Sequence, residues 1–233
     1  MQPIIKMKKV YQIIALLLTV QFAQAQIHEI GVFAGGSNFI GDVGKTDYIS
    51  PNEPAIGILY KWNKSPRFAW RASAMRSKIS GNDLDSDVEG RKDRGFKFEN
   101  TITEFSAGFD FNFFDFDQHQ SGFFLSPYLS SGISYFFHDN LYVIGNEYRT
   151  DGNSGSFALP IIAGVKMKIS NSLILGLESG ARYTFTDDID GSFPKKSSLE
   201  GYKFGNTNSK DWYVFTGMTL TYTFGEKPCY CRE

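Results

Sequence analysis

Apolar residues occupy every second position in eight stretches of this chain. The last stretch shows the pattern plainly, with Tyr213, Gly217, Thr219, Thr221 and Thr223 lying between its larger residues. Those larger residues are Trp212, Val214, Met218, Leu220, Tyr222 and Phe224. A period of two residues gives a β-strand one apolar face, whereas a helix requires a period near 3.6. The pattern therefore predicts an all-β chain.

The connections between these stretches alternate between short and long. We expect strands over residues 28–39, 55–62, 67–77, 101–113, 123–137, 157–169, 173–185 and 212–224. The short connections are 63–66, 114–122 and 170–172, and the long ones are 40–54, 78–100, 138–156 and 186–210. This arrangement predicts an eight-stranded antiparallel transmembrane β-barrel of the outer-membrane type, with short periplasmic turns and long outer loops. Both termini are then expected in the periplasm.

The first 25 residues predict the route to that membrane. Met1 to Ala25 contains a basic start, an apolar run from Val10 to Val20 and the small-residue pattern Ala23-Gln24-Ala25. These are the parts of a secretory signal peptide. The apolar run is too short to span a bilayer as a helix, so the sequence argues against an inner-membrane helical protein. We expect a barrel domain over residues 26–224 and a periplasmic tail over 225–233.

Charged residues alternate onto the face opposite the apolar one and predict a polar lumen. Eight strands enclose a space just wide enough for side chains, and an unpaired buried charge is very costly. Such a lumen is either an ion path or a plug of paired charges, and the barrel size favours the plug. The predicted inward charges are Glu29, Arg67, Arg71, Glu104, Asp110, Lys166, Lys168, Glu178 and Arg182.

Catalytic patterns are weak. His28, His119 and His138 fall at a strand start, a short turn and an outer boundary, so they converge on no common site. We therefore expect no enzymatic activity, no catalytic residues and no cofactor. The formal net charge is −1 and no basic stripe appears, which argues against nucleic-acid binding.

An acidic run from Asp83 to Asp87 begins like a calcium loop. Val88 stands where such a loop needs Gly and Arg94 stands where it needs Glu, so a helix-loop-helix calcium site is not expected. A looser ion site and a solvated acidic loop both remain open. The same two alternatives apply to Asp187, Asp188 and Asp190.

The two cysteines lie in the tail, at Cys229 and Cys231. A disulfide with one residue between its cysteines closes almost no loop and would add little stability to the barrel. The alternatives are a local disulfide that shapes the tail, and a bridge or shared metal site with a partner. Tyr230 between them is a candidate aromatic anchor for a partner.

Several longer motifs resemble one family. They are Glu29-Ile30-Gly31, Phe39-Ile40-Gly41-Asp42, the stretch Phe96 to Phe113, Tyr183 to Asp188, Asp211 to Gly217, and Lys227 to Cys231. In this order, and with the Cys-x-Cys ending, the chain resembles the PorG-like outer-membrane barrels of Bacteroidota. The resemblance implies a component of the type IX protein secretion machinery that associates with a periplasmic ring of a lipoprotein and its partner. It also implies a link to gliding motility in species that glide, and no catalytic residues.

A second function stays open beside secretion. A small barrel of the OmpA or OmpX type, without a secretion role, would be structural or would bind ligands at the cell surface through its long outer loops. Its contact residues would include aromatic side chains such as Tyr142, Tyr148, Tyr202 and Trp212. In both cases the lipid of the outer membrane surrounds the barrel.

Overall fold

The computed structural model describes residues 27–117, 124–145, 147–194, 196–206 and 209–225. The predicted signal peptide, His119, and the tail residues Cys229, Tyr230 and Cys231 lie outside these described residues. Among the described residues, no helix is both long enough and apolar enough to cross a membrane.

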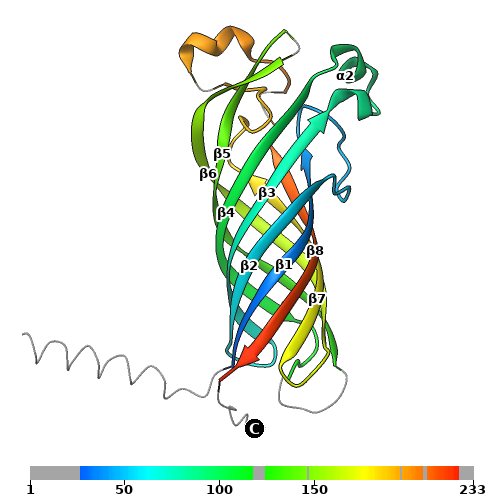
Figure 1. Cartoon of the computed structure of the whole chain (residues 1–233), viewed down its shortest axis with the longest axis vertical. Coiled ribbons are helices and arrows are strands. Elements are labelled where there is room, and N and C mark those ends of the chain that lie inside the picture. The colour runs from blue at the N-terminus through cyan, green and yellow to red at the C-terminus, as the bar shows by residue number, and fades with distance from the viewer. Residues whose placement is uncertain (1–26, 118–123, 146, 195, 207–208, 226–233) are drawn as a thin grey trace, which may run out of the picture.

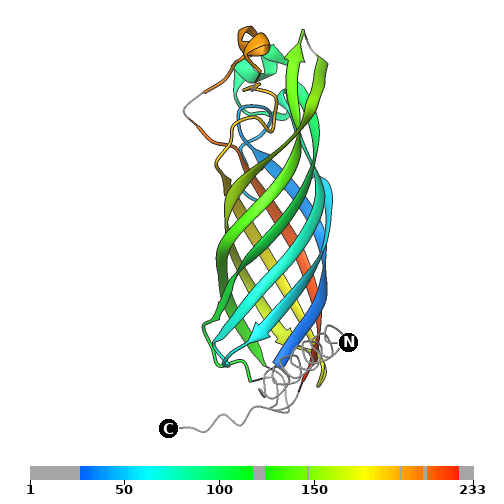
Figure 2. The ribbon, with the colours of Figure 1, turned by 90° about the vertical axis from the view of Figure 1, so that its left-hand side faces the viewer.

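Eight antiparallel strands form one closed barrel in chain order, and β8 pairs with β1 to complete it (Figures 1 and 2). This confirms the predicted fold class. Closure pairs the backbone groups of both would-be edge strands, as a structure in lipid requires. The strands are β1 (Ile27–Ile40), β2 (Glu53–Asn63), β3 (Phe68–Asn82), β4 (Lys97–Asn112), β5 (Leu125–Ile144), β6 (Glu147–Lys168), β7 (Leu173–Thr184) and β8 (Trp212–Phe224).

Alternation along the strands decides which side chains enter the barrel. On β4, Phe105 and Phe109 are 53% and 40% exposed on the outside, whereas Glu104 and Asp110 are completely buried inside. The close approach of neighbouring strands also explains why glycine recurs on the inner face. A side chain at Gly108 would place its Cβ 2.2 Å from the carbonyl oxygen of Ser131 on β5.

The two ends of the barrel differ, as Figure 1 shows. One end, here called the turn end, carries the short connections together with the start of β1 and the end of β8. The other end, here called the loop end, carries the longer connections, which include η2 (Asp83–Asp85), α2 (Glu89–Arg94) and η3 (Ser197–Tyr202). Barrels of this type generally place their long loops outside the cell.

Two of the predicted long loops are largely strand, and the sequence interpretation was wrong there. Residues 138–156 continue β5 and β6 as a two-stranded ribbon that turns at Gly145, where φ is +65°. The ribbon persists because Leu141 and Val143 are buried on its inner side. Similarly, β3 and β4 remain paired as far as Asn82 and Lys97, so the predicted 78–100 loop is shorter than expected.

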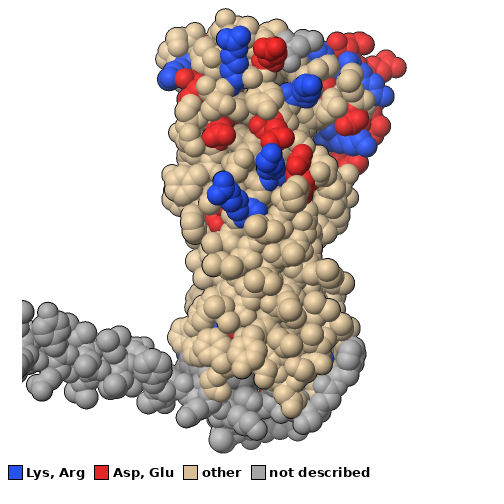
Figure 3. Space-filling model, in the orientation of Figure 1, with Lys and Arg blue, Asp and Glu red and all other residues tan. Residues whose placement is uncertain are grey.

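An apolar belt surrounds the barrel below its charged loop end (Figure 3). Lysine, arginine, aspartate and glutamate gather over the loop end in this view, whereas the belt is almost free of them. A closed barrel with an outward apolar band is the form in which an outer-membrane protein crosses lipid. Outward side chains of the belt include Ile30, Val32, Ile58, Tyr60, Trp70, Phe105, Phe109, Ile133, Leu177 and Leu220.

The belt predicts a strongly position-dependent effect of charge. Phe109→Arg places a charge on the lipid-facing surface and should lower the free energy of unfolding by about 2 to 4 kcal/mol if the residue lies at the bilayer midplane. Leu84→Arg is a matched control, because Leu84 is 64% exposed in η2 at the loop end. Denaturant titration of the two variants in lipid vesicles measures the difference. Equal stability of the two variants would contradict the assigned belt.

Candidate functional site

Charged side chains fill the lumen toward its turn end and neutralise one another. The guanidinium of Arg71 donates two hydrogen bonds to the carboxylate of Glu178, at 2.9 and 2.6 Å. The carboxylate of Asp110 forms an ion pair with the ammonium of Lys61 at 2.6 Å and lies 3.8 Å from the guanidinium of Arg71. The hydroxyl of Tyr128 donates to Glu178 as well. Buried charges in this paired form stabilise a closed interior, because separating any partner leaves a charge without water.

Other charges border this network. Glu29 accepts hydrogen bonds from Asn63 at 2.9 Å and from Thr221 at 3.0 Å. Lys166 is buried, and its ammonium lies 4.5 Å from the centre of the Phe116 ring. Lys168 is also buried. Phe116 belongs to the β4–β5 connection, so an aromatic side chain covers this cation near the turn end.

A second charged group lies farther along the lumen. Glu104 accepts a hydrogen bond from the hydroxyl of Tyr213 at 2.6 Å and forms an ion pair with Arg182 at 3.3 Å. The guanidinium of Arg182 also lies 4.4 Å from the centre of the Phe215 ring and donates to the carbonyl oxygen of Gly180. Glu104 lies on β4, Arg182 on β7 and Tyr213 on β8. The cluster therefore links opposite walls of the barrel.

Apolar side chains fill the lumen beyond Glu104, toward the loop end. Aromatic and branched residues from several strands form one buried cluster there, together with Ile189 from the β7–β8 connection. Close packing thus brings apolar side chains of several strands together inside the barrel. The cluster includes Phe33, Phe39, Met75, Ile79, Phe98, Ile102, Phe136, Leu141, Ile189 and Phe215.

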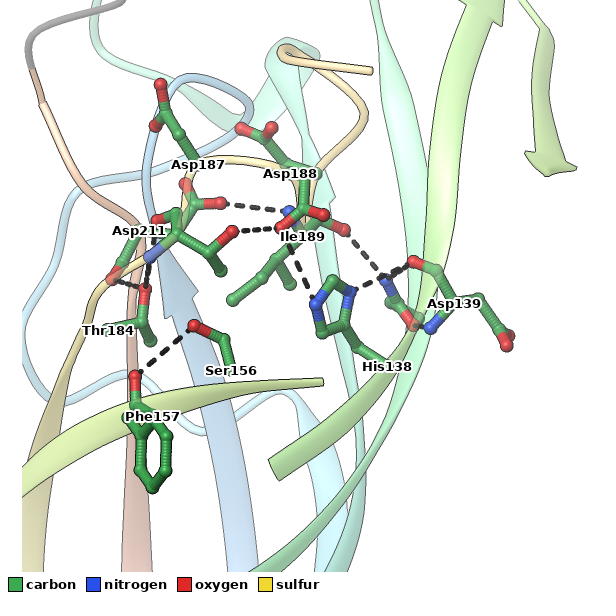
Figure 4. Close-up of polar contacts among 12 residues, drawn as sticks. His138, Asp139, Ser156, Phe157, Thr184, Asp187, Asp188, Ile189 and Asp211 are labelled. Atoms are coloured by element: carbon green, nitrogen blue, oxygen red, sulfur yellow. Dashed lines mark hydrogen bonds and ion pairs between the residues drawn. The ribbon is translucent and has the colours of Figure 1, made fainter. Parts of the chain in front are cut away.

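Residues 186–194, here called the plug segment, enter the loop end of the barrel. Ile189 is fully buried, its N–H donates to Asp211 at 3.0 Å, and its carbonyl oxygen accepts from Asn100 at 2.8 Å. The imidazole of His138 lies 3.5 Å from the carboxylate of Asp188, as Figure 4 shows. The backbone of Asp42 donates to Asp190 at 3.1 Å. The plug segment therefore contacts β4, β5, the β1–β2 connection and Asp211, the residue before β8.

The plug segment gathers acidic side chains in a confined space. Burial, with Asp190 and Asp42 nearby, raises the pKa of Asp187 to about 6. Burial raises the pKa of Asp190, and burial with the charge of Asp190 raises the pKa of Asp211 well above its ordinary value. In the described part of the chain, no three or more His, Cys, Asp or Glu side chains are arranged to hold a metal ion. The structure thus gives no support to an ion site here.

In the other acidic run, the first carboxylate is bound by protein groups. Asp83 is fully buried and its carboxylate binds Arg94 at 2.7 Å, the N–H of Gly44 at 2.9 Å and the N–H of Phe96 at 3.0 Å. Burial raises the pKa of Asp83, but these hydrogen bonds outweigh it and lower the pKa overall. Arg94, which stands where a calcium loop needs Glu, is therefore the partner of the first carboxylate of the acidic run. Asp85 is exposed.

One predicted lumen residue was placed wrongly. Arg67 precedes the first residue of β3, so strand alternation does not apply to it, and its exposed side chain pairs with Asp115 of the neighbouring turn at 2.5 Å. Conversely, the predicted inward charges omitted Lys61, and the tyrosine hydroxyls that donate to Glu178 and Glu104 were not predicted to join them. The signal for Lys61 was present, since it lies on the face opposite Ile58 and Tyr60.

Comparison with protein-family models assigns the chain to a family. The model of the family described as "Domain of unknown function (DUF6089)" matches residues 8–233. The chain belongs to this family. No curated protein matches the sequence.

Solved outer-membrane barrels resemble the structure at low sequence identity. Ail, the attachment invasion locus protein of Yersinia pestis, is 10% identical over 86% of this chain and 100% of its own, with a TM-score of 0.46. Neisserial surface protein A is 10% identical over 86% of this chain and 98% of its own, with a TM-score of 0.48. A major outer membrane protein from Thermus thermophilus is 14% identical over 86% and 100%, with a TM-score of 0.44. The barrel assignment itself follows from the strand pairing.

The Glu104 cluster predicts a large effect when one partner is removed. Arg182→Met should lower the free energy of unfolding by about 3 to 5 kcal/mol, because Glu104 keeps a buried charge without its cation. Arg182→Met combined with Glu104→Met should recover much of that loss. Arg67→Met is the control, since an exposed pair contributes about 1 kcal/mol or less. Unfolding titrations that rank Arg67→Met with Arg182→Met would contradict the buried network.

The plug segment should become more stable as the pH falls. A carboxyl whose pKa is raised in the folded state contributes stability that is present at low pH and lost as the pH rises through that pKa, here about 6 for Asp187. Hydrogen exchange of residues 186–192, corrected for the intrinsic pH dependence of exchange, should therefore be slower at pH 5 than at pH 7.5. Asp187→Asn should reduce this difference, whereas Asp85→Asn should not. An unchanged pH dependence in Asp187→Asn would contradict the assignment.

Proposed function

We propose that this chain is a structural or surface-binding outer-membrane barrel that acts through its outer surfaces rather than through its lumen. The carrying observation is the filled interior. Two charged clusters, an apolar core and the plug segment occupy the space between the strands. An eight-stranded lumen filled in this way favours function by contact over passage of folded cargo or of a hydrated ion.

The β5–β6 ribbon supports a binding role at the loop end. β5 pairs with β4 only as far as Phe137, and β6 pairs with β7 only from Ala158 onward. The ribbon thus extends about 20 Å beyond the pairing of its neighbours. Binding residues are often held on such projections from a rigid scaffold.

Aromatic residues lie on this ribbon and beside it. Tyr148 is 39% exposed, and the rings of Tyr142 and Tyr202 lie 6.5 Å apart. Arg149 is exposed opposite Tyr142. Trp212 is different, because it packs against Tyr183 at the start of β8 and belongs to the barrel wall. The proposed contact set is therefore Tyr142, Tyr148, Arg149 and Tyr202.

Surface binding can be tested with the purified barrel in lipid nanodiscs. The probe is polysaccharide extracted from the surface of the same cells. Tyr148→Ser combined with Arg149→Ser should weaken binding about tenfold or more, because aromatic and arginine side chains dominate small interfaces. Leu84→Ser is the control for an exposed apolar residue on another loop. Equal affinity of both variants, with normal membrane permeability in a deletion strain, would overturn the proposal.

A role in type IX secretion is a second candidate, favoured by the PorG-like motifs. As an anchor for a periplasmic ring lipoprotein and its partner, the barrel would present its turn end. The start of β1, the end of β8 and the exposed Arg67–Asp115 pair lie there, and the tail with Cys229, Tyr230 and Cys231 follows β8 in the sequence.

A tail variant tests this candidate. Cys229→Ser combined with Cys231→Ser should leave the barrel folded, yet lower both affinity capture of the ring lipoprotein and the amount of secreted protein. Wild-type capture and secretion in this variant, and normal secretion in a deletion strain, would reject a secretion role.

A further inference from the structure

The outward face of β3 changes character along its length. Going toward the loop end, its outward residues are two large aromatics, two alanines, two cations and two small polar residues. Outward residues on one strand repeat about every 7 Å. In order they are Phe68, Trp70, Ala72, Ala74, Arg76, Lys78, Ser80 and Asn82.

The two alanines form the floor of an apolar trough within the belt. Ile58 and Tyr60 of β2 and Phe105 of β4 form its walls, because their larger side chains rise on either side of Ala72 and Ala74. The trough has a volume of about 640 Å³ and lies on the lipid-facing surface. A hydrocarbon chain is the occupant that the membrane supplies for such a depression.

Arg76 lies one outward position beyond the trough. Its side chain is exposed, and no acidic side chain among the described residues forms an ion pair with it. Lys78 beside it already pairs with Glu99 at 2.5 Å. Lys97, on the outward face of β4, is exposed and also forms no ion pair within the described part of the chain. Lys97 pairs with Asn82, six residues along β3 from Arg76, and so lies about 20 Å farther toward the loop end. Arg76 is thus the cation available to an anion at the boundary of the belt.

A polar cleft follows beyond Arg76, toward the loop end. It has a volume of about 430 Å³ and is lined by Asn52, Ser80, Asn82, Asp85, Lys97, Glu99 and Tyr148, among others. The amide of Asn52 is fixed on Ser80, at 3.2 Å from its carbonyl oxygen and 3.1 Å from its hydroxyl. Amide and hydroxyl groups beside an aromatic ring suit hydroxyl-rich ligands, since they combine hydrogen bonds with an apolar contact.

We propose that this face, seen in Figure 3, binds an anionic glycolipid of the surrounding outer leaflet. The trough takes an acyl chain, Arg76 contacts a phosphate, and the cleft, with Lys97 on its wall, takes the sugar. An ordinary phospholipid supplies an acyl chain and a phosphate but no large sugar for the cleft, whereas the order of apolar, cationic and polar parts along β3 matches the order of parts in a phosphorylated glycolipid. The inference concerns the lipid-facing wall and does not depend on the proposed function.

Lipid retention tests the proposal. The intact barrel in detergent is mixed with equal amounts of Kdo2-lipid A and phosphatidylglycerol, passed through a size-exclusion column and analysed by native mass spectrometry. Wild-type protein should retain lipid A preferentially. Arg76→Gln combined with Lys97→Gln should lower retained lipid A about tenfold or more, as expected for lost charge-assisted hydrogen bonds. Ala72→Leu combined with Ala74→Leu, which fills the trough, should also lower it.

Matched controls lie on other parts of the barrel. Lys92→Gln removes an exposed cation of α2 that lines neither the trough nor the cleft, and Ala163→Leu enlarges an outward alanine of β6 far from β3; neither should change retention. Equal retention of lipid A and phosphatidylglycerol by the wild type would overturn the proposal. So would trough-filling that lowers retention of both lipids alike while the cation variants behave as wild type, because the occupant would then be any acyl chain.

Discussion

The closed ladder of backbone hydrogen bonds is the constraint on which the rest of this structure depends. Once β8 pairs with β1, no strand edge remains within the barrel wall, and every side chain of that wall points either outward or into the lumen. A closed barrel of eight strands is narrow. Inward side chains therefore have neighbours on every wall, and inward charges meet their opposites instead of water.

That confinement explains the two parts of the interior. Arg71 and Glu104 belong to clusters in which each charge has a counter-charge or hydroxyl from another strand. Beyond them, apolar residues and Ile189 fill the remaining width. The charged clusters hold the walls in register, whereas the apolar part and the plug segment close the loop end. Because both parts fill the lumen, we expect the protein to act by contact with lipid, a ligand or a partner.

Much of this could be read from the sequence because the strand period is local. The faces of Phe109 and Asp110 are set by neighbouring residues alone, so strand type, lumen charges and belt were accessible without coordinates. The error at Arg67 arose where the period ends, one residue before β3 begins. The remaining features depend on contacts between distant residues. The polar sequence of the β5–β6 ribbon looks like a loop, and it becomes strand because the cross-strand partner and the plug segment cover Leu141. The contact between Asp42 and Asp190 joins residues 148 positions apart, so no local pattern indicates it.

Single-channel recording on the purified barrel in planar bilayers tests the central claim most directly. A lumen filled by paired charges and apolar side chains predicts no reproducible unitary current above that of a lipid-only control. A reproducible, ion-selective conductance of the wild-type protein would show that the lumen is a path, and it would contradict the account.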